Sequence, residues 1–368
     1  MDRADSRHAS RAAGPPGRTS GPLVAGVELA ATGVRAVSGR RSDGRLHIAG
    51  VGFASLRPGA ISGGQVVDRE AVAAALAQAL EGAEHRDRAT RVIAAIDGDD
   101  VRTFHVGTVF DRAAATEPIV AGEVERAVRE SREEAARIAR LGAAEDPALR
   151  GVAAVQLRDD VAGFVVDGRG LEQPVGFQGR FVEVRTDVSL APLLQAGAAT
   201  GAIEGAKRRG TVTSGIYALA RLLAASGIGD GGVLRLGVDV TAYAIVRGGR
   251  VIATRVFGLG REAFASRAAT READAAVWAQ CVLAPLASAD ENVAFPSRWS
   301  FVGVPETLLA LPLALGDAVV ALRGGSVDIA PLRVTAATRV VATPEMHADD
   351  LVACGTAALA AGLYEAVA

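Results

Sequence analysis

The sequence predicts an α/β protein built from two related lobes that face one cleft. Two stretches, residues 24–37 and 233–249, each look like a pair of short strands joined by a tight turn of small residues. Such turns bring backbone N–H groups close together, as phosphate-binding loops do. The chain has 368 residues, too many for one ordinary core, and 49% of them are hydrophobic, which is enough for buried sheets.

The first half continues with a third strand, a helix and a fourth strand. The third strand is expected at 46–53, with a turn at 57–59. Asp68 is a favourable N-cap for an Ala-rich helix that extends to about residue 83, and an apolar run at 91–96 indicates the fourth strand. This order of elements is typical of the start of a ribonuclease-H-like fold.

Residues 97–183 break this order and predict a small α+β insert. A strand at 101–109 precedes a strongly charged helix at about 120–141, whose apolar residues recur at helical spacing. We expect strands at 152–157 and 162–167, a Gly-rich turn, and a strand at 181–188. The charged helix face is interpreted as a solvated surface, and the alternative is a surface that binds a partner.

From residue 189 the α/β pattern returns. A helix is expected to residue 203, and a loop at 227–232 precedes the second hairpin. The other expected elements are a strand at 211–213, a helix at 214–225, strands at 233–236, 242–247 and 250–257, a helix at 271–287, strands and a helix within 299–334, a short strand at 340–343 and a terminal helix at 351–368. The terminal run is apolar, but its length and Glu365 favour a packed helix over a membrane anchor.

Composition excludes some functions. A net charge of -2 and an aromatic content of 4% argue against nucleic-acid binding. The five His residues show no metal-ligand spacing, so no metal site is expected. Cys281 and Cys354 lie in apolar runs and predict buried thiols in a reducing compartment. Residues 1–22 predict a disordered tail, with a weak basic contact to a membrane or an acidic partner as the alternative, and no secretory signal.

Four stretches carry a resemblance to a known family, namely residues 26–37, 48–68, 120–137 and 164–180. Through them the chain resembles the FtsA family, bacterial actin-like proteins that link division-ring filaments to the membrane. The last run, from Phe164 to Arg180, is similar to the family's Asp-Gly … Pro-Val-Gly-Met-x-Gly segment. The resemblance covers residues 23–260 well and the last hundred residues loosely.

This resemblance implies an actin-like ATPase fold, which is a duplicated ribonuclease-H-like fold, with an α+β subdomain 1C of the SHS2 type. Subdomain 2B and the membrane helix after the fold are expected to be missing. The implied divisions are a tail at 1–22, subdomain 1A at 23–96, subdomain 1C at 97–183, more of 1A at 184–229, subdomain 2A at 230–335, and a return to 1A at 336–368.

The resemblance also implies a nucleotide cleft between the two turns. In this superfamily, acidic residues and glycines in these turns hold Mg²⁺ and phosphates. The residues implied to line the cleft are Glu28, Ala30, Ala31, Thr32, Gly237, Thr241 and Gly303. Arg235 stands where the second turn is expected to carry an Asp. In the same turn, the expected Gly, Gly and Thr are replaced by Val238, Asp239 and Val240. Pro305 interrupts the segment that is expected to bind adenosine. We therefore expect a pseudo-ATPase with no catalytic residues, with ATP and Mg²⁺ as the only candidate cofactors.

The function implied is a cell-division adaptor that binds the FtsZ-like tubulin homologue and other divisome proteins, with self-association as a further expectation. It would lie in the cytoplasm, at the inner face of the membrane at the division site, with indirect membrane association. Two alternatives stay open: a PilM-like pilus-assembly adaptor, and an ATP-binding enzyme of the actin-like ATPase and kinase superfamily.

Overall fold

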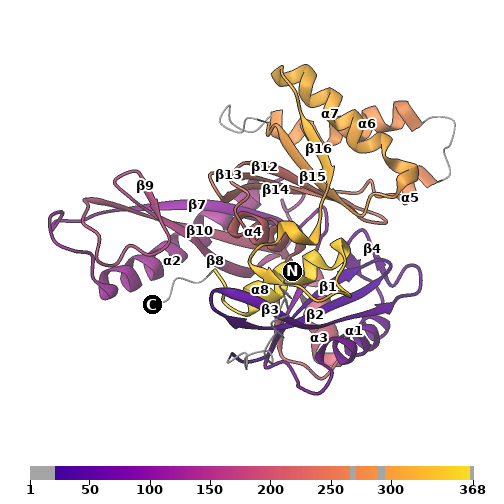
Figure 1. The fold of residues 1–368 in the computed structure, drawn as a ribbon, viewed down its shortest axis with the longest axis horizontal. Helices are drawn as coiled ribbons and strands as arrows, with labels where there is room; N and C mark the ends of the chain where they lie inside the picture. The colour runs from indigo at the N-terminus through magenta and orange to yellow at the C-terminus, as the bar shows by residue number, and fades with distance from the viewer. Residues whose placement is uncertain (1–20, 266–270, 288–294, 365–368) are drawn as a thin grey trace, which may run out of the picture.

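The computed structural model describes residues 21–265, 271–287 and 295–364. They form two lobes and a separate sheet beside them, which Figure 1 shows at the left. The predicted tail at residues 1–20 lies outside the described residues.

Lobe 1 is a six-stranded sheet in the order β11-β6-β1-β2-β3-β17. Its strands are β1 (Val24–Ala30), β2 (Gly33–Ser42), β3 (Arg45–Ser55), β6 (Arg91–Ile96), β11 (Gly210–Ser214) and β17 (Val340–Val341). Helices α1 (Arg69–Glu84) and α3 (Leu193–Gly205) cover one face. The carboxylate of Asp68 accepts the N–H of Ala71 at 3.0 Å, which confirms the predicted N-cap of α1. A short hairpin, β4 (Ile61–Ser62) and β5 (Gln65–Val66), precedes α1.

Lobe 2 is a five-stranded sheet in the order β14-β13-β12-β15-β16. Its strands are β12 (Gly231–Leu236), β13 (Thr241–Arg247), β14 (Arg250–Phe257), β15 (Arg298–Val302) and β16 (Asp328–Pro331). Helices α6 (Arg271–Ala287) and α7 (Ala310–Arg323) cover its outer face, and a short α5 (Glu262–Ala265) follows β14. Gly231 and Gly232, expected in a loop, already pair with β13.

The two sheets share one topology. In each, three antiparallel strands are followed by two parallel ones, so that β1, β2, β3, β6 and β11 correspond to β12, β13, β14, β15 and β16. This repeat confirms the duplicated α/β fold that the two hairpins predicted. It also makes the end of β1 equivalent to the end of β12, which decides what faces the cleft.

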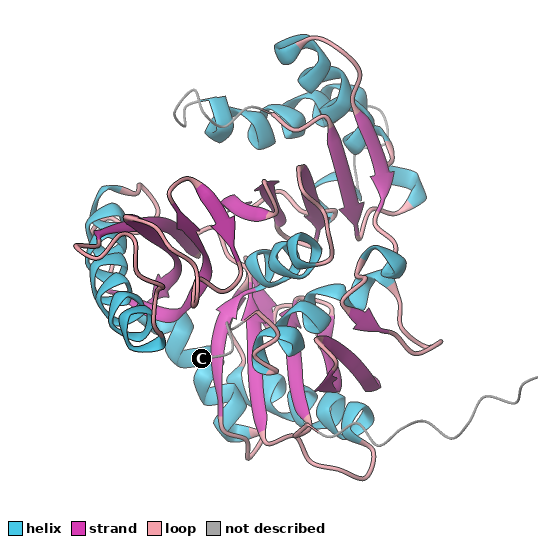
Figure 2. Ribbon diagram, turned by 60° about the vertical axis from the view of Figure 1, so that its left-hand side comes forward, coloured by secondary structure: helices cyan, strands magenta, loops and turns pink. Residues whose placement is uncertain are grey.

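Two buried helices lie between the sheets. They are α4 (Gly215–Ala225) and α8 (Leu351–Ala360), which Figures 1 and 2 show near the centre of the molecule. Side chains from both sheets pack on them. All ten residues of α8 are buried, which confirms a packed terminal helix. It ends at Ala360, earlier than expected, and a turn follows at 361–364, while residues 365–368 lie outside the described residues. No helix in the described part of the chain has both the length and the apolar character that a membrane span requires. Cys354 in α8 is buried, while Cys281 in α6 is only half-buried, and both are free thiols.

The insert is a four-stranded sheet, ordered β7-β10-β8-β9, with one long helix against it. Its elements are β7 (Arg102–Asp111), α2 (Ala121–Glu145), β8 (Ala154–Val166), β9 (Arg169–Leu171) and β10 (Phe181–Pro192). The two strands expected at 152–157 and 162–167 are one strand, because Arg158 and Asp160 pair with each other at 2.6 Å and so do not interrupt β8. The helix expected from residue 189 begins at Leu193, since β10 stays paired with β8 as far as Pro192.

Candidate functional site

The two lobes present equivalent strand ends to the cleft between them. In lobe 1, β1 and β6 run parallel with Glu28 opposite Ala95, and Asp97 follows the end of β6. In lobe 2, β12 and β15 run parallel with Arg235 opposite Val302. Ligands of α/β proteins bind at such carboxyl ends of parallel strands. The geometry therefore makes this cleft the first candidate site.

The first turn, Ala31 and Thr32, is only two residues long, because Ala30 pairs directly with Gly33. The backbone carbonyl of Thr32 accepts the N–H of Leu56 at 3.1 Å. The side chains of Ala30 and Ala31 are half-exposed toward the cleft, where a phosphate loop would carry glycine.

The second turn spans residues 237–240 and is bonded to the segment that follows β14. Gly237 donates to the carbonyl of Val240 at 2.8 Å, and Arg261 donates to the carbonyl of Gly237 at 2.9 Å. Gly260 donates to the carbonyl of Asp239 at 3.1 Å, and a Cβ at Gly260 would lie 2.3 Å from the carbonyl oxygen of Val238. Gly260 thus packs closely against the second turn and helps to hold its conformation, a role that was not predicted from the sequence.

Arg235 crosses the cleft from lobe 2 to two carboxylates of lobe 1. Its guanidinium forms an ion pair with Glu28 and lies 3.9 Å from the Asp97 carboxylate. Glu28 is 3% exposed and Asp97 is 6% exposed, so all three charges are largely withdrawn from water. Buried charges are expensive unless they are paired, and here one cation serves two acids.

Burial shifts the titration of these groups. Desolvation raises the pKa of Asp97 to about 7, although the N–H groups of Ile216 and Gly215 and the Ser214 hydroxyl oppose the rise. Desolvation lowers the pKa of Arg235 to about 10, so this guanidinium still carries its charge at neutral pH. Near pH 7 the cluster therefore holds a fixed cation and one carboxyl group close to its titration midpoint.

A second contact also joins the lobes. The carboxylate of Asp239 in the second turn accepts the backbone N–H of Gly63 from the β4–β5 hairpin. That hairpin is held against lobe 1, because Gly64 has a φ of +80° and a Cβ there would lie 1.7 Å from the carbonyl oxygen of Asp97. Only glycine satisfies both the positive φ and the close approach.

The structure brings six of the seven predicted residues to one small cavity. Glu28, Ala30, Ala31, Thr32, Gly237 and Gly303 line it. Thr241 does not line this cavity: its side chain is buried in lobe 2, where Oγ1 donates to the carbonyl of Leu259 at 2.6 Å and accepts the indole N–H of Trp278 at 3.0 Å. Sequence reasoning missed Arg35, Asp97, Arg261 and Asp349, which line the same cavity from four separate segments.

The residues present do not fit a Mg²⁺-bound nucleotide. The cavity has a volume of about 70 Å³, whereas pockets for cofactors usually measure roughly 300–1,000 Å³. The resemblance leads us to expect an acidic residue where Arg235 stands, and Asp239 would place a negative charge beside the phosphates. No cluster of His, Cys, Asp or Glu suited to a metal ion occurs among the described residues.

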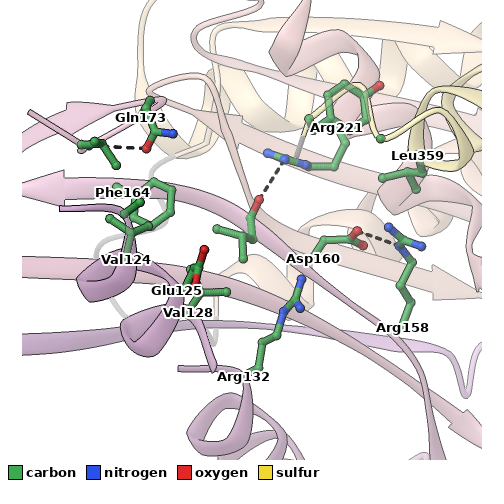
Figure 3. A pocket seen from close by; sticks show the side chains of 15 residues that line it. Val124, Glu125, Val128, Arg132, Arg158, Asp160, Phe164, Gln173, Arg221 and Leu359 are labelled. Atoms are coloured by element: carbon green, nitrogen blue, oxygen red, sulfur yellow. Dashed lines mark hydrogen bonds and ion pairs between the residues drawn. The ribbon is translucent and has the colours of Figure 1, made fainter. Parts of the chain in front are cut away.

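A larger hollow lies between the insert and lobe 1, and we call it the insert groove (Figure 3). Its volume is about 230 Å³. Its walls come from α2, β8, the loop after β9, α4, and the end of α8 with the turn that follows. Its apolar lining residues are Ala121, Val124, Val128, Val161, Phe164, Val175 and Leu359.

One end of the insert groove is charged. Arg221 of α4 is buried, its Nε has no hydrogen-bond partner among the described residues, and its NH groups reach only the carbonyls of Val161 and Ala162, at 3.5 and 3.4 Å. Its guanidinium lies 5.1 Å from the ring centre of Tyr364. Burial raises the pKa of the nearby Asp160 carboxyl, and the positive charges of Arg158 and Arg221 oppose this rise. A buried donor with weak partners beside a cavity is well placed to take an acceptor from a ligand.

No protein-family model matches the chain, and no curated protein matches it. Among solved structures, the PilM-PilN type IV pilus biogenesis complex is 19% identical, with a TM-score of 0.56 over 94% of this chain and 97% of that one. The ethanolamine utilization protein EutJ of Carboxydothermus hydrogenoformans is 14% identical, with a TM-score of 0.41 over 84% and 85%. A protein of Bacteroides thetaiotaomicron with an actin-like ATPase fold is 9% identical, with a TM-score of 0.41 over 87% and 94%.

Together with the duplicated topology, the likeness to the structure of the PilM-PilN complex confirms the actin-like ATPase fold. At such identities the likeness concerns the fold alone. The specific resemblance to FtsA stays a prediction. Part of the run that carried it has a local structural cause, because Asp167 and Gly168 take positive φ values of 46° and 82° in the turn between β8 and β9. Asp-Gly is a preferred pair for such hairpin turns in any family.

Proposed function

We propose that this chain is an actin-like adaptor that holds a segment of a partner protein in the insert groove and does not turn over ATP. The observation that carries this proposal is the groove itself, an apolar hollow of about 230 Å³ with a buried, weakly partnered arginine at one end. Pockets of this kind accept the anchor side chains on which protein interfaces depend most.

The shape and chemistry of the insert groove favour a peptide over a cofactor. Its volume of about 230 Å³ is below the roughly 300–1,000 Å³ typical of cofactor pockets, and suits a few aliphatic side chains. The apolar wall of Val124, Val128 and Phe164 would bury those side chains. Arg221 would take an acceptor such as a backbone carbonyl, which gives the peptide a direction as well as an affinity.

We also propose that the chain does not hydrolyse ATP, because of the residues that line the cleft between the lobes. An ATPase or kinase needs an acidic residue that binds the metal ion, and it needs room for the phosphates. Here Arg235 stands where the acid is expected, and the carboxylate of Asp239 lies in the turn that would hold the phosphates. Titration of the purified chain with ATP in the presence and absence of Mg²⁺ tests this. Tight Mg²⁺-dependent binding would favour the enzyme alternative.

Two kinds of partner protein are considered, a pilus-assembly protein and a tubulin-like division protein. A complex named for PilM and PilN resembles this chain over almost its whole length, which favours a pilus-assembly partner. The run 164–180 favours the alternative, a division adaptor that binds the FtsZ-like tubulin homologue, although its turn has the local cause given above. We therefore place the pilus-type adaptor first. Either role would bring the chain to the cytoplasmic face of the membrane through its partner.

The test is a binding assay with both partners from the same organism. Immobilised chain is exposed in turn to the purified PilN-type protein and to the purified tubulin-like division protein. Val128→Asp places a charge on the groove wall, and we expect it to weaken retention of the true partner by roughly tenfold or more. Val277→Asp is the matched control, because Val277 lies on α6 of lobe 2 and is 61% exposed.

Three outcomes separate the alternatives. Retention of the PilN-type protein that Val128→Asp removes supports the pilus adaptor, and the same pattern with the tubulin-like protein supports the division adaptor. Binding that Val128→Asp and Val277→Asp leave equally strong would show that the groove is not the docking site.

A further inference from the structure

We infer that the cleft between the lobes is closed by an ionic lock made of the chain's own residues, Arg235 with Glu28 and Asp97, together with the contact of Asp239 to Gly63. The lock takes the place in which the family resemblance expects a metal-bound nucleotide. This inference concerns the relation of the two lobes and does not depend on which partner occupies the insert groove.

The duplicated topology shows why one substitution creates the lock. Glu28 on β1 and Arg235 on β12 lie on equivalent strands and face each other across the cleft. Two acids at these positions would repel each other unless a cation lay between them. Arg235 places a positive charge at the lobe 2 position. It therefore attracts Glu28 across the cleft without any ligand between them.

The second departure from the expected phosphate turn also joins the lobes. Asp239 replaces a glycine, and its carboxylate accepts the N–H of Gly63 from lobe 1. The two residues that least suit a nucleotide therefore both make polar contacts between the lobes. If the cleft had merely lost its ligand, its altered residues would have no reason to pair across it.

Neighbouring charges do not provide the same link. Arg35 pairs with Asp349 at 3.6 Å and with Asp350 at 3.2 Å, and these residues belong to lobe 1 and to the segment that leads into α8. Arg261 lines the same cavity from lobe 2, and its like charge helps to lower the pKa of Arg235. Removal of Arg261 should therefore leave the lobes closed, which makes it the matched control.

A simpler interpretation is that Arg235 only neutralises two buried carboxylates. The two interpretations differ for the double variant Arg235→Met with Glu28→Gln. This variant removes the ion pair and also one of the stranded acids. If Arg235 only neutralises, the double variant should behave as the wild type. If Arg235 is the lock, the double variant should regain stability relative to Arg235→Met while its lobes stay open.

The experiment is amide hydrogen exchange on the full chain, followed by mass spectrometry of peptides that cover residues 58–68 and 236–262. We expect exchange in these peptides to speed up by roughly tenfold in the Arg235→Met variant and in the double variant, and to stay at the wild-type rate in Arg261→Met. Thermal unfolding, measured in parallel, should rank the double variant above Arg235→Met. Should Arg235→Met fail to fold, the double variant still decides the question.

Two results would overturn the lock. One is a double variant whose cleft peptides exchange at the wild-type rate. The other is a wild-type chain in which added ATP and Mg²⁺ slow the exchange of these peptides, because the nucleotide would then close the cleft in place of Arg235. Unchanged exchange on addition of ATP and Mg²⁺ supports the inference.

Discussion

Replacing Asp97 by Asn should change how the stability of the chain depends on pH. Burial raises the pKa of this carboxyl from 3.8 to about 7 in the folded chain. A carboxyl group whose pKa is higher in the folded state holds a proton that the unfolded chain has released. Its contribution is therefore fully present below pH 3.8 and is lost as the pH rises through about 7.

The magnitude follows from the shift. Each pKa unit corresponds to about 1.4 kcal/mol, so between pH 5 and pH 8 the wild type should lose about 3 kcal/mol that the variant keeps. Asn can still accept the Ile216 N–H that the carboxylate accepts at 2.9 Å, which preserves the local geometry. The Arg235–Glu28 pair then remains as one cation and one anion.

The assay is urea unfolding followed by far-ultraviolet circular dichroism, for wild type, Asp97→Asn and the control Asp317→Asn, at pH 5 and pH 8. Asp317 lies exposed on α7. The quantity of interest is the change in unfolding free energy between the two pH values. If Asp97→Asn shows the same change as the wild type and the control, the carboxyl is not titrating in this range and the reasoning fails.

Two further predictions concern residues that shape the cleft and lobe 2. Gly64→Ala should destabilise the chain by at least ~2 kcal/mol, because its φ is +80° and its Cβ would overlap the Asp97 carbonyl, whereas Gly63→Ala, with a φ of +58° and open space, should cost only about 1 kcal/mol. Equal melting temperatures for these two variants would contradict this. Thr241→Val should cost about 2 kcal/mol in denaturant unfolding, since the Trp278 indole N–H loses its acceptor in a buried site. It should leave amide exchange of the cleft peptide at residues 58–68 at the wild-type rate, because the Thr241 side chain does not line the cavity. Faster exchange of that peptide would contradict this.

Much of the fold could be predicted because it follows from local patterns. Alternating apolar residues and short turns located both hairpins, and Asp68 located the start of α1. The break expected near residue 160 was wrong, since the sequence cannot show that Asp160 is paired with Arg158 inside the strand. The helix expected from residue 189 was placed too early because strand pairing extends to Pro192 and long-range pairing outweighs helix propensity.

The candidate site was predictable only in part. Arg235 was recognised as foreign to a phosphate turn, but its pairing with Glu28 joins positions more than two hundred residues apart and depends on how the lobes meet. The sequence could not show that Thr241 does not line the cavity, because a motif fixes residue order and not the side of the strand to which a side chain points. The insert groove gave no sequence signal, since its walls come from several distant segments.

Helix α4 has a consequence for how the molecule responds to change. The backbone N–H of Ile216 at its first turn binds Asp97 at 2.9 Å, the Tyr217 hydroxyl binds Asp187 of the insert sheet at 3.0 Å, and Arg221 lines the insert groove. Every residue of α4 from Gly215 to Ala224 is buried, so any displacement of this helix must also displace closely packed neighbours. Because the cleft and the insert groove are both built on α4, we expect the effects of substitutions at its two ends on stability to depart from additivity.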